Sequence, residues 1–239
     1  MTIEKALITQ STSSRWLQTE VVTDSEGGLK CRFATVNEDH EILINHATCT
    51  VKYSELPTMK WKQEQALKSL ADIRRLRERL ADGQCDRFNS HMIYRMIATL
   101  ADFDRGYRGL KEIVLDSKAM AAASKVDLGA LERREDEDAI YSAHPAYVDS
   151  FSQSAGFVMN ANERSDLEVE CFVNHGWKSF QLYETLKADG DYESYVQMKS
   201  NGGSVWEGTL TVVKGNRVVA MFEGITVCPG RKSELVLFG

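Results

Sequence analysis

Several features are scarce in this chain of 239 residues, and each absence excludes a class of protein. No run of about eighteen apolar residues occurs, and the first residues lack the apolar core of a secretion signal. These two absences predict a cytoplasmic protein with no membrane partner. Basic residues are outnumbered, with 29 Lys and Arg against 35 Asp and Glu, which gives a net charge of −6. The balance argues against a nucleic-acid partner, because phosphate binding relies on clustered Lys and Arg.

Cysteine is also scarce, and the five cysteines lie singly, far apart and without a CxxC pair. Their spacing indicates neither a zinc site nor a disulfide framework. We therefore expect free and mostly buried thiols at Cys31, Cys49, Cys85, Cys171 and Cys228. A metal site made from His144, His175 and Asp149 has no HxH or HxxxH spacing to support it, so we predict no metal and no cofactor.

The hydrophobic content of 43% is enough to build a sizeable core, as one large domain or two small ones. Residues 1–55 read as a small antiparallel sheet, because runs rich in β-branched and aromatic residues alternate with turn residues. The expected strands are ALITQ, WLQTEVVT, LKCRFATV, EILI and ATCTVKY. No helix is expected there, so the apolar face of the sheet needs a cover from elsewhere. Uncovered faces and strand edges favour pairing between copies, and we expect a homodimer.

Residues 56–128 read as a helical linker that leads into further strands. Pro57 marks the change, and an apolar stripe predicts a helix from Trp61 to Leu80, which Gly83 stops. A second helix is expected after Asn89, running to about Arg108. The runs KEIVLDS and AMAAASKVDL then predict two strands.

A largely apolar helix is predicted over residues 145–160, where Pro145 suits the first turn. Asp149 and Gln153 are four residues apart and therefore share one helical face. An unpaired carboxylate in such surroundings costs several kcal/mol or has a raised pKa, as an acid/base group requires. The alternative is that Asp149 serves only the helix N-terminus.

Residues 129–239 are expected to form a compact unit around this helix. The charged segment Gly129 to Ile140 predicts an exposed loop at the rim of a cleft. After the helix, four runs of strand signals are separated by Asp189-Gly-Asp, Asn201-Gly-Gly and Lys214-Gly-Asn, each of which signals a hairpin. One buried helix followed by an antiparallel sheet that can wrap it is the outline of a hot-dog fold, in the α+β class.

The motifs resemble the product template domain of fungal non-reducing polyketide synthases, a double hot dog related to polyketide synthase dehydratases. The pattern His144-Pro145-x3-Asp149-x3-Gln153 is similar to the second catalytic motif of the dehydratases. The resemblance extends in the family's order over nearly the whole chain, through HATCTV, IYRMIATLADFDRGYRGL, GFVMN, VNHGW, YESYVQM and EGITV.

The resemblance implies a cyclase that promotes aldol-type ring closure of a poly-carbonyl chain, either released or bound to a carrier protein. Asp149 takes the place of the family's catalytic Asp, and Gln153 would fix a carbonyl or hydroxyl group. The family's catalytic His lies in an opening GHxVxG-like segment that has no counterpart here. The expected fold is therefore one complete C-terminal hot dog, a truncated N-terminal hot-dog sheet and a helical linker, in a stand-alone relative of the domain.

Without that His, the base has to come from elsewhere or is not needed. His144 and His175 are the best candidates among the five histidines, although most histidines in a fold of this size have structural roles. Two further alternatives stay open. The scaffold could serve dehydration or a pericyclic ring closure in a preformed apolar cavity, or it could bind a polyketide without catalysis.

Overall fold

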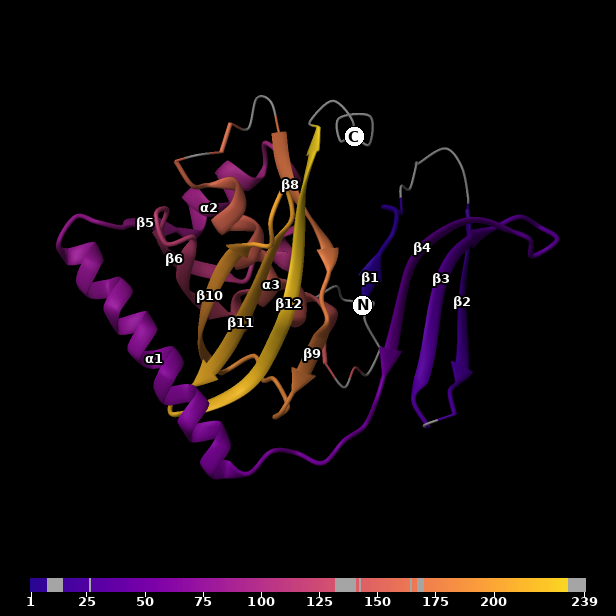
Figure 1. The fold of residues 1–239 in the computed structure, drawn as a ribbon, viewed down its shortest axis with the longest axis horizontal. Helices are drawn as coiled ribbons and strands as arrows, with labels where there is room; N and C mark the ends of the chain where they lie inside the picture. The colour runs from indigo at the N-terminus through magenta and orange to yellow at the C-terminus, as the bar shows by residue number, and fades with distance from the viewer. Residues whose placement is uncertain are drawn as a thin grey trace.

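The computed structural model describes residues 1–7, 15–25, 27–131, 141, 143–163, 165–166 and 170–231. Its strands form a sheet of antiparallel pairs in the order β2-β3-β4-β1-β8-β12-β11-β10-β7-β6-β5, with β9 beside β12 (Figure 1). The strands are β1 Thr2–Ile3, β2 Trp16–Thr23, β3 Leu29–Val36, β4 Ile42–Val51, β5 Asp86–Asn89, β6 Leu110–Asp116, β7 Ala121–Asp127, β8 Glu170–Gly176, β9 Ser179–Leu182, β10 Asp191–Ser200, β11 Trp206–Lys214 and β12 Arg217–Arg231. The helices are α1 Met59–Ala81, α2 Ser90–Ile97 and α3 Pro145–Asn160, with the 3-10 turns η1 Arg105–Tyr107 and η2 Leu128–Ala130.

Helix α3 is the centre of the main hydrophobic core. It packs against strands β6 to β8 and β10 to β12, and Phe151 and Val158 are completely buried there. Each such side chain contributes roughly 1.5–3 kcal/mol to the stability of the fold by leaving water. The predicted helix 145–160 and the α+β hot-dog architecture are confirmed, because one apolar helix is held by one antiparallel sheet.

Helix α1 covers the opposite face of the same sheet (Figure 1). Neighbouring residues of a strand point to opposite faces, and Ile113 of β6 joins the α3 core whereas Val114 joins the α1 cluster. In that second cluster, Ile73 and Leu76 of α1 are buried. The helix predicted at Trp61 to Leu80 is confirmed, with the Thr58 hydroxyl accepting a hydrogen bond from the Trp61 N–H. None of the helices in the described residues is long and apolar enough to cross a membrane.

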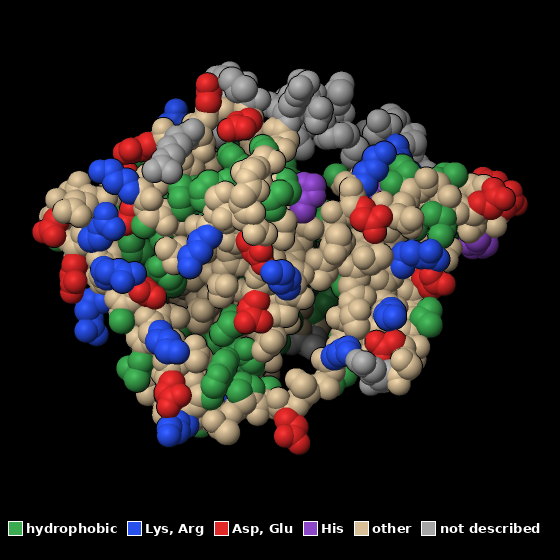
Figure 2. Space-filling model, viewed as in Figure 1, with side chains coloured by type: hydrophobic (Ala, Val, Ile, Leu, Met, Phe, Trp, Pro, Cys, Tyr) green, Lys and Arg blue, Asp and Glu red, His purple; other side chains and the backbone are tan. Residues whose placement is uncertain are grey.

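Strands β2, β3 and β4 extend the sheet away from this body, and β1 joins them to β8 (Figure 1). The junction needs a glycine, because Gly176 has φ +122° and a Cβ there would lie 2.2 Å from the Met1 carbonyl oxygen. In the described part of the chain no helix packs on β2 to β4, and large apolar side chains such as Trp16 stay exposed. On the face of the molecule seen in Figure 2, basic and acidic side chains are interspersed.

Three sequence expectations about local structure were wrong. The second helix ends at Ile97 and not near Arg108, because Asp104 caps the separate turn η1 and the Arg108 side chain donates to the Phe103 carbonyl. The segments EILI and ATCTVKY form one strand, β4, because a bulge opposite Ala34 keeps the pairing with β3 continuous. Strand β1 was not predicted, and residues 6 and 7 of the expected strand ALITQ are not in a strand, while the rest of it lies outside the described residues.

Further corrections concern the C-terminal half and the cysteines. The Asp189-Gly-Asp turn joins no hairpin, because β9 pairs with β12 while β10 pairs with β7 and β11. The run after α3 is divided into β8 and β9 at Gly176. Only Cys85 and Cys171 are buried, and the other three cysteines are half-buried. The charged loop expected at Gly129 to Ile140 lies outside the described residues from position 132 onward.

Candidate functional site

A cavity of about 270 Å³ lies beside α3. One wall is a single face of the helix, on which Asp149, Gln153 and Phe157 follow at four-residue steps. The remaining walls are largely apolar and come from the end of α2, the segment after it and β8, through Ile97, Leu100, Ala101, Phe103, Cys171, Phe172, Val173 and Asn174. Apolar walls with a few placed polar groups are typical of small-molecule sites.

Four groups form a chain of hydrogen bonds that ends at the cavity. The Leu110 N–H donates to the Tyr94 hydroxyl at 2.9 Å, and this hydroxyl donates to Oε1 of Gln153 at 2.8 Å. The Gln153 amide nitrogen donates to Oδ2 of Asp149 at 2.7 Å and to the Tyr107 carbonyl at 2.8 Å. Because both ends of the Gln153 amide are engaged, its orientation is fixed. Asp149 is therefore held by Oδ2, and no described residue donates a hydrogen bond to its Oδ1, which can accept one from a ligand.

The electrostatics around this chain of hydrogen bonds favour a carboxyl group that exchanges protons. Burial raises the pKa of Asp149, and the hydrogen bond from Gln153 offsets only part of that effect. Burial also raises the pKa of Tyr94, so its hydroxyl keeps its proton and remains a donor to Gln153. A cavity-lining acid with a raised pKa is a candidate general acid/base.

The histidines chosen from the sequence do not reach this cavity. His144 is the N-cap of α3, where its Nδ1 accepts a hydrogen bond from the Ala146 N–H at 3.2 Å and its ring packs against Tyr147. His175 is exposed on β8, next to Asn174, which does line the cavity. All five histidines lie within the described residues, and none lines the cavity. The structure therefore brings Asp149 and Gln153 together and leaves His144 and His175 apart from them.

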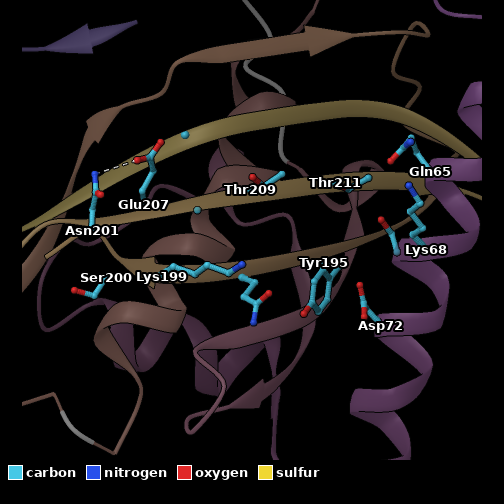
Figure 3. A pocket seen from close by; sticks show the side chains of 14 residues that line it. Gln65, Lys68, Asp72, Tyr195, Lys199, Ser200, Asn201, Glu207, Thr209 and Thr211 are labelled. Atoms are coloured by element: carbon cyan, nitrogen blue, oxygen red, sulfur yellow. Dashed lines mark hydrogen bonds between the residues drawn. The ribbon is translucent and has the colours of Figure 1, made fainter.

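A second hollow, of about 440 Å³, lies between α1 and the outer face of β10 and β11 (Figure 3). Its lining is polar, with Lys68 from α1, Tyr195 and Lys199 from β10, and Thr209 from β11. Both acids in this lining are neutralised, Asp72 by Arg75 at 2.7 Å and Glu207 by Lys178. In the described part of the chain no group of three His, Cys, Asp or Glu side chains is arranged to hold a metal ion. Of these two hollows, the cavity beside α3 is the one that combines apolar walls with a half-buried acid, and we take it as the candidate functional site.

Comparison with known sequences identifies the family. Residues 77–234 match the family described as polyketide synthase dehydratase N-terminal domain. The chain belongs to the polyketide synthase dehydratase family.

Relatives of this dehydratase-family chain are fungal synthases, as the sequence resemblance predicted. The chain is 36% identical over 228 residues to the non-reducing polyketide synthase VdtA of Byssochlamys spectabilis, covering 95% of this chain and 10% of the synthase. It is 34% identical over 247 residues to the norsolorinic acid synthase stcA of Emericella nidulans, covering 99% of this chain and 11% of that protein. The chain thus spans about a tenth of the length of these relatives.

Solved structures confirm the fold. The dehydratase domain from the CurJ module of curacin polyketide synthase matches with a TM-score of 0.68 at 15% identity, covering 98% of this chain and 75% of that one. The dehydratase domain of PpsC from Mycobacterium tuberculosis, solved in complex with C12:1-CoA, matches with a TM-score of 0.66 at 14% identity, covering 96% and 73%. At these identities the match establishes the hot-dog dehydratase fold of the dehydratase-family chain.

Sequence reasoning missed two residues that shape the site of this dehydratase-family chain. Tyr94 is buried on α2, and a buried tyrosine hydroxyl usually has a hydrogen-bond partner, which was the available signal. Its partner Gln153 lies 59 positions away, which no local pattern reveals. Asn160 ends α3 and exchanges hydrogen bonds with the backbone of Phe172 at 2.8 and 3.0 Å. This contact fixes β8 as the opposite wall of the cavity.

Proposed function

We propose that this dehydratase-family chain acts in polyketide biosynthesis as a product-template-like cyclase. Its reaction would be aldol-type ring closure of a poly-carbonyl chain, presented by a carrier protein or already released from one. The observation that carries the proposal is the half-buried Asp149 carboxyl on the wall of an apolar cavity, with one oxygen held by Gln153. The 29–36% identity to fungal polyketide synthases supports the choice of substrate class.

The chemistry of an aldol closure fits the groups on this wall. A methylene between two carbonyls has an acidic proton, and the carbonyl that is attacked becomes an alkoxide, which needs a proton. The carboxylate form of Asp149 would take the first proton, and the carboxylic acid form would supply the second. The raised pKa brings these two forms closer in population near neutral pH. Phe103, Phe157 and Phe172 would hold the folded carbon chain and keep water away.

Dehydration is the second candidate, because the matched family and the solved relatives are dehydratase domains. The Asp149 carboxylate would then take the α-proton of a β-hydroxyacyl chain and pass it to the departing hydroxyl group, which leaves as water. A role in binding a polyketide without catalysis is favoured by a different observation, namely that none of the five histidines, all of them in the described residues, lines the cavity.

The test compares two substrates and two variants. The purified protein is incubated separately with a poly-β-carbonyl thioester and a β-hydroxyacyl thioester. The products are separated by chromatography and identified by mass spectrometry. Cyclisation that is lost in Asp149→Asn and kept in Asp39→Asn supports the proposal, since Asp39 is an exposed residue of the β3–β4 turn. Loss of water from the β-hydroxyacyl substrate alone would favour the dehydratase. Binding of the poly-carbonyl compound without any product would favour the non-catalytic role.

A further inference from the structure

Cys31 and Cys49 lie directly opposite each other on the antiparallel strands β3 and β4. Side chains in that register share one face of the sheet, with Cβ atoms roughly 4.5–5.5 Å apart. A disulfide requires a Cβ separation of roughly 3.5–4.5 Å and a Cα separation of roughly 4.4–6.8 Å. Closure of a bond between the two sulfur atoms therefore needs a movement of only about 1 Å.

The surroundings leave this pair accessible. Both cysteines are half-buried, and their neighbours on the same face, Val21 and Val51, are 55% and 40% exposed. No helix in the described part of the chain covers β3 and β4 (Figure 1). Burial and the adjacent Cys31 thiol both raise the pKa of Cys49, and the contribution of Cys31 reflects how close the two thiols lie.

The chain contains a second pair of nearby cysteines that serves as an internal contrast. Cys171 on β8 is opposite Gly230, and Cys228 on β12 is opposite Val173. This diagonal arrangement separates the Cα atoms by roughly 7–8 Å, at or beyond the limit for a disulfide. Cys171 is also buried, with 1% of its surface exposed. Two cysteines on neighbouring strands are therefore not placed for a disulfide by proximity alone. They also have to lie directly opposite each other, as Cys31 and Cys49 do.

We propose that Cys31 and Cys49 form a dithiol site that low-molecular-weight disulfides, such as oxidised glutathione, convert into an intrachain disulfide. The Cys31 thiolate attacks one sulfur of the disulfide, forms a mixed disulfide and releases one glutathione thiolate. The Cys49 thiolate then attacks the Cys31 sulfur, closes the Cys31–Cys49 bond and releases the second glutathione. Two protein thiols are oxidised, the reagent is reduced to two thiols, and the protons from both cysteines end on the released glutathione.

The bond would tie β3 to β4 in the part of the sheet that no helix supports. It closes a loop from residue 31 to residue 49, which restricts the unfolded chain. We expect the thermal unfolding midpoint to rise by about 5 °C on oxidation. The same treatment would leave the cavity beside α3 unchanged, because neither cysteine lines it.

The experiment exposes the reduced, folded protein to oxidised glutathione and measures intact mass, disulfide-linked peptides and the thermal midpoint. The native chain is expected to lose two hydrogen atoms, keep three of its five thiols and yield a linked Cys31–Cys49 peptide. Cys49→Ser is expected to gain one glutathione at Cys31 instead, with no rise in the midpoint. Cys228→Ser, the matched control, should behave as the native chain does.

Two results would overturn the proposal. One is a native chain that keeps glutathione on Cys31 without closing the bond, which would mean that the sulfur atoms cannot meet. The other is a linked peptide that joins any other pair of cysteines. Loss of folding in Cys49→Ser would not hide these outcomes, because both are read from the native protein and from Cys228→Ser.

Discussion

Replacement of Tyr94 by Phe removes one hydroxyl group and tests the hydrogen-bond chain behind the site. That hydroxyl accepts from the Leu110 N–H and donates to Gln153, and Leu110 and Gln153 are 0% and 7% exposed. Water therefore has little access to either partner once the hydroxyl is gone. The aromatic ring remains, so the packing around α2 is kept.

The magnitude follows from the two partners that are left behind. A buried polar group without a partner costs about 1–3 kcal/mol, and the Leu110 N–H cannot move because it belongs to β6. The Gln153 amide can turn and recover part of its loss. We expect Tyr94→Phe to lower the free energy of unfolding by about 2–4 kcal/mol. Gln153 keeps the bonds from its amide nitrogen to Asp149 and to the Tyr107 carbonyl but loses the partner of its amide oxygen. Asp149 is then held less firmly, and any turnover should fall roughly tenfold.

Urea unfolding followed by tryptophan fluorescence measures this change, with equal slopes in the two proteins as the check on two-state behaviour. Tyr107→Phe is the matched control, because Tyr107 is 41% exposed and the described residues show no hydrogen bond from its hydroxyl. It should change the free energy of unfolding by less than about 0.5 kcal/mol. An equally small effect for Tyr94→Phe would refute the hydrogen-bond chain.

Three other predictions follow from the same contacts. Asp149→Asn should raise the free energy of unfolding at neutral pH, because burial raises the pKa of Asp149 and its ionised form lowers the stability of the fold. This gain in stability should vanish on acidification below the ordinary aspartate pKa, and a gain that grows in acid would contradict the reasoning. Gly156→Ala should raise the free energy of unfolding by about 0.5–1 kcal/mol, since Gly156 lies within α3 and a Cβ there meets nothing within 4 Å. A lower unfolding temperature in calorimetry would contradict this prediction and show that the added methyl group clashes. Light scattering during size exclusion should show a dimer that uses the uncovered face of β2 to β4, with exposed Trp16, and a monomer at high concentration would remove this idea.

Much of this fold follows from local patterns in the sequence. Apolar residues that recur at steps of three and four positions predict α1 and α3. The runs of β-branched and aromatic residues that alternate with polar ones predict β2, β3 and β10 with the observed bounds. The contact between Asp149 and Gln153 follows from helical spacing alone, and it is present at 2.7 Å. These features depend on residues that are close together in the sequence, so a single sequence is enough to predict them.

Features that depend on distant contacts could not be read in this way. The sequence shows that His144 precedes a helix, but whether its ring caps that helix or faces a cavity depends on Tyr147 and on the sheet around it. The Tyr94 hydroxyl reaches the Leu110 N–H because α2 ends at Ile97 and the chain turns back into β6. The pairing of β9 with β12 similarly depends on which strands the whole sheet brings together.

The titration of the Asp149 carboxyl by carbon-detected NMR, alone and with a bound aromatic or poly-carbonyl compound, tests the central claim most directly. Asp149→Asn identifies the signal by its disappearance. We predict a pKa above the ordinary aspartate value of 3.8, and a further rise when the compound displaces water from the cavity. A pKa at or below that value, unaffected by the compound, would show a carboxyl group in open water and contradict the assignment of the site.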